Sequence, residues 1–188
     1  MIELLSFQQL FILGRGTGKM FQSKLQRNLS YLVFAVYLVL LAWLVLFKFE
    51  TNLSRMEHIR GINLIPFYYD TEVSLMLHAK EVSYNVLIFV PLGVYVCMFW
   101  PKWSMVKKLL PGFALSVLFE ALQYAFAIGA TDITDLITNT LGGALGIALF
   151  LLLQRFFKKR CATVVNVIGG TIEVLGLILL GILIVSNL

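Results

Sequence analysis

Charged side chains are scarce in this chain of 188 residues, where they make up 13% while hydrophobic residues make up 60%. The mean hydropathy is +0.89, and a soluble domain carries about 25% charged residues, so the composition excludes an ordinary soluble fold. Histidine is limited to His58 and His78, which lack the spacing of paired metal ligands, so no metal site is expected. The two cysteines, Cys97 and Cys161, are expected on the reducing side of a membrane, without a disulfide.

The chain instead contains long runs of apolar residues. Five stretches have the length of about 17 to 23 residues that an α-helix needs to cross a bilayer, and they are 29–47, 84–100, 109–128, 135–153 and 164–185. The chain is therefore predicted to be an all-α, polytopic membrane helix bundle. Residues 1–28 form an N-terminal segment on the cytoplasmic side, where they can lie at the membrane interface; residues 29–153 form the main membrane domain; residues 154–188 form a basic loop and a fifth helix.

The basic residues predict how the bundle is oriented, because cytoplasmic loops retain Lys and Arg. Most of them lie before the first span, between spans two and three, or between spans four and five: Arg15, Lys19, Lys24, Arg27, Lys102, Lys107, Lys108, Arg155, Lys158, Lys159 and Arg160. The N-terminus is therefore expected inside, and the C-terminus and the long loop 48–83 outside. The net charge of +5 follows from these positions, so anionic lipid headgroups are the expected partner rather than nucleic acid.

The stretch 113–146 is the strongest candidate for a functional site, because it places acids inside apolar runs. Glu120 and Gln123 share one face of the third span, while Asp132, Asp135 and Asn139 form a stripe at the start of the fourth. A charge near the bilayer centre costs about 2.5 to 3.5 kcal/mol, so it persists mainly where it faces the bundle interior or water. Negative charge also complements the dipole at a helix start, which explains the two Asp residues but leaves Asn139 unexplained.

The protonation of Glu120 depends on its neighbours. Buried without a cation, it would be neutral and would donate a hydrogen bond; paired with Arg60 or with a ligand amine, it would stay ionised. A second intramembrane acid, Glu173, lies on the fifth span with Asn166. A carboxylic acid made neutral by burial and bonded to a neighbouring helix explains Glu173 more simply than an acid pair does.

Residues outside this stretch can complete the site. In the external loop, Asn63 precedes Leu64-Ile65-Pro66-Phe67, which either dips into the membrane interface, with Asn63 bonding backbone groups, or forms an ordinary turn. Asn85 either points from the second span toward Asp132 or bonds its own backbone as a helix start.

Three further residues predict how the helices pack. Pro91 is expected to kink the second span, because it cannot donate the backbone hydrogen bond that its position requires. Gly142 and Gly146 are expected to allow close approach of the third or the fifth span.

Several segments carry a family resemblance that covers about 29–153. They are Tyr37-Leu38-Val39 through Phe47-Lys48, Asn63-Leu64 with Pro66-Phe67, Asn85-Val86 with Ile88-Phe89 and Pro91, Phe126 through Asp135, and Ile137-Thr138-Asn139-Thr140 with Gly142-Gly143. On these motifs the chain resembles the VanZ-like family of bacterial membrane proteins, and looks close to its enterococcal teicoplanin-resistance member. Ala130 departs from the family, which often has Arg before the first Asp, so an ion-pair role for that Arg does not carry over.

The resemblance implies low-level resistance to teicoplanin and related lipoglycopeptides in the bacterial plasma membrane. One hypothesis is a non-enzymatic protein with an outer-facing polar cleft that has apolar walls. The cleft binds the drug, a lipid headgroup or a cell-wall precursor. Its residues are Glu120, Gln123, Asp132, Asp135, Asn139, Asn63, Asn85 and Arg60. The alternative is an intramembrane enzyme that modifies an envelope lipid or peptidoglycan precursor, with Glu120 as general acid and Asp135 as base or as part of a cation site. A transporter has less support, because no inverted repeat is visible. No cofactor is expected, and the small-residue faces leave room for oligomers.

Overall fold

The structure is a computed structural model that describes residues 20–47, 59–68 and 75–186, with the side chains of Ile59, Arg60 and Ala130 excepted. It is built almost entirely from helices: α2 (Lys24–Phe47), α3 (Leu75–Phe99), α4 (Met105–Phe126), α5 (Ile133–Phe157) and α6 (Cys161–Ser186), with the short 3-10 helix η2 (Lys158–Arg160) between the last two. The all-α prediction is confirmed at this level. The predicted stretches 29–47, 135–153 and 164–185 lie within helices, whereas 84–100 ends one residue past α3 and 109–128 runs two residues past α4, as far as the first residue of β2.

Four helical segments among the described residues are long and apolar enough to cross a membrane. They are Lys24–Phe47, Leu75–Phe99, Met105–Phe126 and Ile133–Ser186, the last of which contains α5, η2 and α6. Apolar helices of this length identify a membrane protein. The arrangement as five separate spans stays a prediction.

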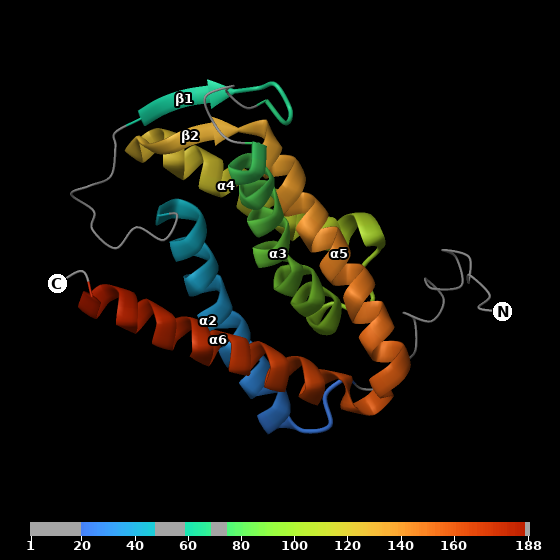
Figure 1. Ribbon diagram of the computed structural model, residues 1–188. Helices are drawn as coiled ribbons and strands as arrows, with labels where there is room; N and C mark the ends of the chain where they lie inside the picture. The colour runs from blue at the N-terminus through green and yellow to red at the C-terminus, as the bar shows by residue number, and fades with distance from the viewer. Residues whose placement is uncertain (1–19, 48–58, 69–74, 187–188) are drawn as a thin grey trace.

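Two short strands lie at one end of the helices, where the sequence predicted only loop and turn (Figure 1). Strand β1 (Ile59–Asn63) pairs in parallel with β2 (Ile128–Asp132), in a register that places Asn63 opposite Asp132. The long loop is therefore partly folded, and the segment between the third and fourth predicted spans is extended rather than a simple turn. Paired strands satisfy backbone groups that would otherwise be exposed at the end of the bundle.

Helix α3 lies at the centre of the bundle. Seven consecutive residues near its C-terminal end, Leu92 to Met98, are buried, so it is covered on every side and its hydrophobic pattern has little helical periodicity. One apolar cluster joins α3 to α5 and the start of α6 through Met98, Phe150 and Cys161. A second joins α3 to α2 and α4 through Leu41, Phe89 and Phe119.

The two ends of the bundle differ in chemistry. The strand end, defined by β1 and β2, also holds the end of α4 and the start of α5 (Figure 1). At the opposite end, Gln22 Nε2 donates to the Lys159 carbonyl oxygen and Phe21 stacks on Phe99, which joins the residues just before α2 to η2 and to the end of α3. We call this the basic end, and it carries Lys24, Arg27, Lys102, Lys107, Arg155, Lys158, Lys159 and Arg160.

Candidate functional site

Asp132 is the centre of the polar network at the strand end. It caps the N-terminus of α5, and its Oδ1 accepts a hydrogen bond from the Thr134 amide at 2.7 Å. Its Oδ2 accepts from Asn63 Nδ2 at 3.1 Å, and its own amide donates to Glu120 Oε2 at 3.0 Å. One residue therefore ties β1, α4 and α5 together, and the predicted convergence of Glu120, Asp132 and Asn63 is confirmed.

Asp135 forms the second link of the network, this time to α3. Asn85 Nδ2 donates to Asp135 Oδ1 at 2.6 Å, and Asp135 lies in the first turn of α5, where the helix dipole favours negative charge. The alternative in which Asn85 starts a helix is wrong, because α3 begins ten residues earlier at Leu75. The hydrophobic boundary of the second predicted span lies at residue 84, so hydropathy alone does not detect the earlier start of α3.

Deeper in the bundle, the polar faces of α4 and α5 meet directly. Asn139 Nδ2 donates to Ser116 Oγ at 2.9 Å, and Gln123 Nε2 donates to the Val45 carbonyl oxygen of α2 at 3.0 Å. Asn139 and Gln123 are each 1% exposed. The oxygen of each amide is buried and has no hydrogen-bond partner among the described residues. An unpaired buried acceptor costs about 1 to 3 kcal/mol, so these two oxygens favour a ligand that brings donors.

Glu120 is 7% exposed and uses its carboxylate as an acceptor toward the Asp132 amide. Its carbonyl oxygen also accepts from Thr131 Oγ1 at 3.3 Å, so α4 holds β2 in two places. Glu120 thus lies at the junction of α4, β2 and α5. Arg60, its predicted partner, pairs through its backbone with Gly129 of β2, while the Arg60 side chain lies outside the described part of the chain.

The segment after β1 packs on the same network. Asn63 Oδ1 accepts from the Ile65 amide at 3.1 Å, which confirms that Asn63 bonds a backbone group before Pro66. The Phe67 amide donates to Thr134 Oγ1 at 2.9 Å. Thr134, which is 2% exposed, was not predicted as a site residue. Its position within Asp132-Ile133-Thr134-Asp135 was the available signal, since the residues that follow a helix cap often bond the chain that precedes the helix.

The two glycines of α5 pack against α3, not against the third or fifth predicted span, so that prediction was wrong. A Cβ on Gly142 would collide with the Val86 carbonyl oxygen, and one on Gly146 with that of Val90. Gly93 of α3 contributes to the same contact, since its own Cβ would collide with the Gly143 carbonyl oxygen. A two-sided glycine contact brings the backbones closest, and the spacing on α5 alone cannot identify its partner helix.

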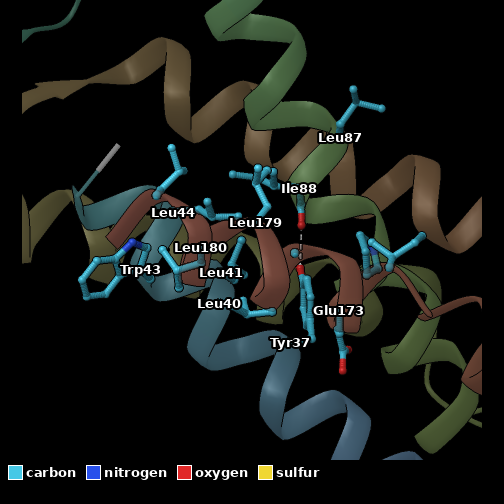
Figure 2. A pocket seen from close by; sticks show the side chains of 14 residues that line it. Tyr37, Leu40, Leu41, Trp43, Leu44, Leu87, Ile88, Glu173, Leu179 and Leu180 are labelled. Carbon is cyan, nitrogen blue, oxygen red and sulfur yellow. Dashed lines mark hydrogen bonds between the residues drawn. The ribbon is translucent and has the colours of Figure 1, made fainter. Parts of the chain in front are cut away.

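An apolar cavity of about 340 Å³ lies between α2, α3 and α6, and Figure 2 shows its lining. Trp43, Leu44, Leu87 and Leu180 are among its walls. Pro91 also borders the cavity, and near it the Tyr37 hydroxyl donates to the Ile88 carbonyl oxygen at 2.8 Å. The Trp43 indole nitrogen is buried without a partner among the described residues. The cavity therefore offers a largely apolar volume.

Glu173, the second intramembrane acid, borders this cavity rather than the polar network. It lies beside the Tyr37 ring, and its carboxyl group points away from the Tyr37 hydroxyl (Figure 2). Within the described ranges, no group of three or more His, Cys, Asp or Glu side chains could hold a metal ion.

Comparison with known proteins gives two matches. The VanZ/LLP1 family model matches residues 34–154, which include every residue of the polar network. The chain is also similar to Protein VanZ of Enterococcus faecium, with 39% identity over 153 residues, covering 80% of this chain and 91% of that protein. No solved structure matches the chain.

Proposed function

The chain belongs to the VanZ/LLP1 family, and from this membership we propose that it gives low-level resistance to teicoplanin and related lipid-bearing glycopeptides. It acts at the outer face of the bacterial plasma membrane, as a bundle of five spans whose strand end faces outward. The basic residues gathered at the opposite end support this orientation, because Lys and Arg are retained in the cytoplasm.

The observation that carries the proposal is a pair of amide oxygens, unpartnered within the described ranges, on the faces of α4 and α5 that also carry acids. Gln123 Oε1 and Asn139 Oδ1 are buried without partners among the described residues, in a network that also contains the carboxylates of Glu120, Asp132 and Asp135. Such a site favours a molecule that brings amine or hydroxyl donors. The drug, a lipid headgroup and a cell-wall precursor all carry groups of this kind, and binding one of them lowers the amount of drug that reaches its target.

The cavity between α2, α3 and α6 supplies the apolar surface that the proposal needs for a lipid tail. Helix α2 borders both sites, because Leu44 lines the cavity and the carbonyl oxygen of the next residue, Val45, accepts a hydrogen bond from Gln123. The cavity volume of about 340 Å³ falls within the range of about 300 to 1,000 Å³ for small-molecule sites. This pairing of a polar site with an apolar cavity accounts for an effect confined to lipid-bearing drugs.

The test measures the teicoplanin susceptibility of cells that express Glu120→Gln or Asp132→Asn protein. The matched control is Glu81→Gln, which changes an exposed acid near the start of α3. Membrane accumulation of each variant is measured by immunoblot of the membrane fraction. We expect protection to fall to the level of cells without the protein for the two site variants and to stay intact for the control. Full protection by Glu120→Gln and Asp132→Asn proteins that accumulate normally would contradict the proposal.

Profiles of envelope lipids and peptidoglycan precursors provide a second test. A binding protein leaves these profiles unchanged, so we expect no difference between cells with and without the chain. A new or missing lipid or precursor species that depends on Glu120 and Asp135 would indicate the intramembrane enzyme instead.

A further inference from the structure

A groove of about 750 Å³ runs along the contact between α2 and α6, beginning at the basic end of the bundle. It is polar where it opens: Gln26 Nε2 donates to Thr163 Oγ1 at 2.8 Å across its mouth, beside Ser23. It is apolar farther along, where Leu29, Val167 and Leu175 line it. A groove with a polar mouth and an apolar length has the chemical profile of a lipid molecule.

Asn166 provides a specific polar group within this groove. It is 6% exposed, and its Nδ2 donates to Ser30 Oγ at 2.8 Å. Its Oδ1 is buried and has no partner among the described residues. Asn166 is more than nine-tenths buried and lines the groove, and its Oδ1 lacks a donor in the described part of the chain. It therefore favours a ligand that carries a hydroxyl group.

The charged residues in the first turn of α2 and in η2, directly before α6, are all basic, and none of them lines the groove itself. Lys24 and Arg27 border a hollow that shares Ser23 with the groove. Lys158, Lys159 and Arg160 form η2, directly before α6, and the Lys159 carbonyl oxygen is bonded to Gln22. Neither α2 nor α6 has an acid in its first turn. Basic pockets between membrane helices on the cytoplasmic side bind anionic headgroups.

We propose that this groove binds an anionic glycerophospholipid of the cytoplasmic leaflet whose headgroup carries hydroxyl groups. The phosphate lies near Lys24, Arg27 and Arg160, a headgroup hydroxyl donates to Asn166 Oδ1, and one acyl chain follows Leu29, Val167 and Leu175. The lipid joins α2 to α6 at the end opposite the polar network, so this site is separate from that network, while its place in the cytoplasmic leaflet rests on the orientation given in the proposed function.

The test uses the full-length protein purified in a neutral detergent and measures lipid binding by native mass spectrometry. The probes are phosphatidylglycerol, phosphatidic acid and phosphatidylcholine, which separate charge from headgroup hydroxyl groups. We expect phosphatidylglycerol to bind most tightly, phosphatidic acid less tightly and phosphatidylcholine least. Equal binding of phosphatidylglycerol and phosphatidylcholine would overturn the proposal.

Glycine substitutions test where the lipid binds. Gly170 lines the groove, and a Cβ there would meet nothing within 4 Å, so the side chain of Gly170→Leu has room to start and occupies part of the groove. Gly181 has the same open surroundings but does not line the groove, which makes Gly181→Leu the matched control. We expect Gly170→Leu to weaken phosphatidylglycerol binding by about tenfold, and Gly181→Leu to leave it unchanged. Equal affinities of the two variants would overturn the location.

Charge substitutions test the mouth of the groove. The double variant Lys24→Gln, Arg27→Gln removes two cations from the hollow next to the groove. The double variant Lys102→Gln, Lys107→Gln removes two exposed cations elsewhere on the basic end. We expect the first pair to weaken phosphatidylglycerol binding by about thirtyfold, and the second pair to have little effect. The same loss from both pairs would mean that the lipid is attracted only by the overall charge, and would overturn a defined site.

Discussion

Asn63 and Asp132 lie 69 residues apart in the chain, and Asn63 Nδ2 donates a hydrogen bond to Asp132 Oδ2 at 3.1 Å. Their Cα atoms are also opposite one another at the end of the parallel β1–β2 pair. Asp132 in turn caps α5 and bonds Glu120 through its amide. The contact therefore fixes β1 on the polar ends of α4 and α5, and any ligand at the strand end meets all three elements together.

Exchanging these two side chains separates a structural role from a ligand-binding role. Asp132→Asn alone places an amide opposite the Asn63 amide, whereas Asn63→Asp with Asp132→Asn restores a donor, an acceptor and the net charge. We expect the single variant to lower the midpoint of thermal unfolding, since a hydrogen bond to a charged group contributes about 1.5 to 3 kcal/mol. We expect the double variant to recover most of that stability, as measured in detergent.

Teicoplanin protection by the same variants gives the functional half of this cycle. The double variant moves the carboxylate from the α5 cap to β1, so a ligand that depends on the position of that charge loses it. We expect the double variant to be stable and poorly protective. Recovery of both stability and protection would mean that the pair serves only to hold the fold.

The glycine contact between α3 and α5 makes a second prediction. A methyl group at Gly146 would collide with the Val90 carbonyl oxygen, while one at Gly143 would meet nothing within 4 Å. Gly146→Ala should therefore destabilise the protein by about 1 to 3 kcal/mol or more, because backbone cannot move aside as a side chain can. Gly143→Ala should unfold at the wild-type temperature. Similar melting temperatures for the two variants would contradict the packing described for these helices.

A third prediction concerns the hydroxyl group of Tyr37, which donates to the Ile88 carbonyl oxygen near Pro91. Tyr37→Phe removes this bond and keeps the ring, so we expect a loss of about 0.6 kcal/mol, the average for hydrogen bonds between membrane helices. The control is Tyr31→Phe, at a ring that is 50% exposed and stacks on Phe99. Chemical denaturation in mixed micelles measures both. A larger loss from Tyr31→Phe than from Tyr37→Phe would contradict the assignment.

The orientation of the bundle makes a fourth prediction. Cys97 and Cys161 are 1% and 0% exposed, so they should react little with a membrane-impermeant maleimide on intact cells. A cysteine at Tyr68, exposed at the strand end, should be labelled from outside, whereas one at Lys102, exposed at the basic end, should require permeabilised cells. The opposite pattern would reverse the orientation and remove the strand end from the outer surface.

Much of the site could be predicted from spacing within single helices. Glu120 and Gln123 on α4, and Asp135 and Asn139 on α5, share faces at three- and four-residue intervals, so each pair was expected to point one way. Their partners were harder to predict, because Ser116, Val45 and Asn85 depend on how helices pack. Gly142 and Gly146 illustrate the limit: their spacing indicates close approach, while the choice of α3 depends on Gly93, on another helix.

The strands could not be predicted by the same means. Strands β1 and β2 each contain five residues, and their pairing joins segments 69 positions apart, as the Ile59–Ile128 pair shows. Short parallel strands have no local periodicity that distinguishes them from a loop. The cavity beside Glu173 was likewise invisible, because it exists only through the way α6 lies against α2 and α3.

The most direct measurement is the binding of fluorescent teicoplanin to intact cells that contain equal amounts of wild-type or Glu120→Gln protein. Cells with the wild-type protein should show altered surface binding relative to cells without it, and cells with Glu120→Gln should match cells without it. A glycopeptide that lacks a lipid tail should bind all three equally. The account is contradicted if Glu120→Gln changes teicoplanin binding as fully as the wild-type protein does.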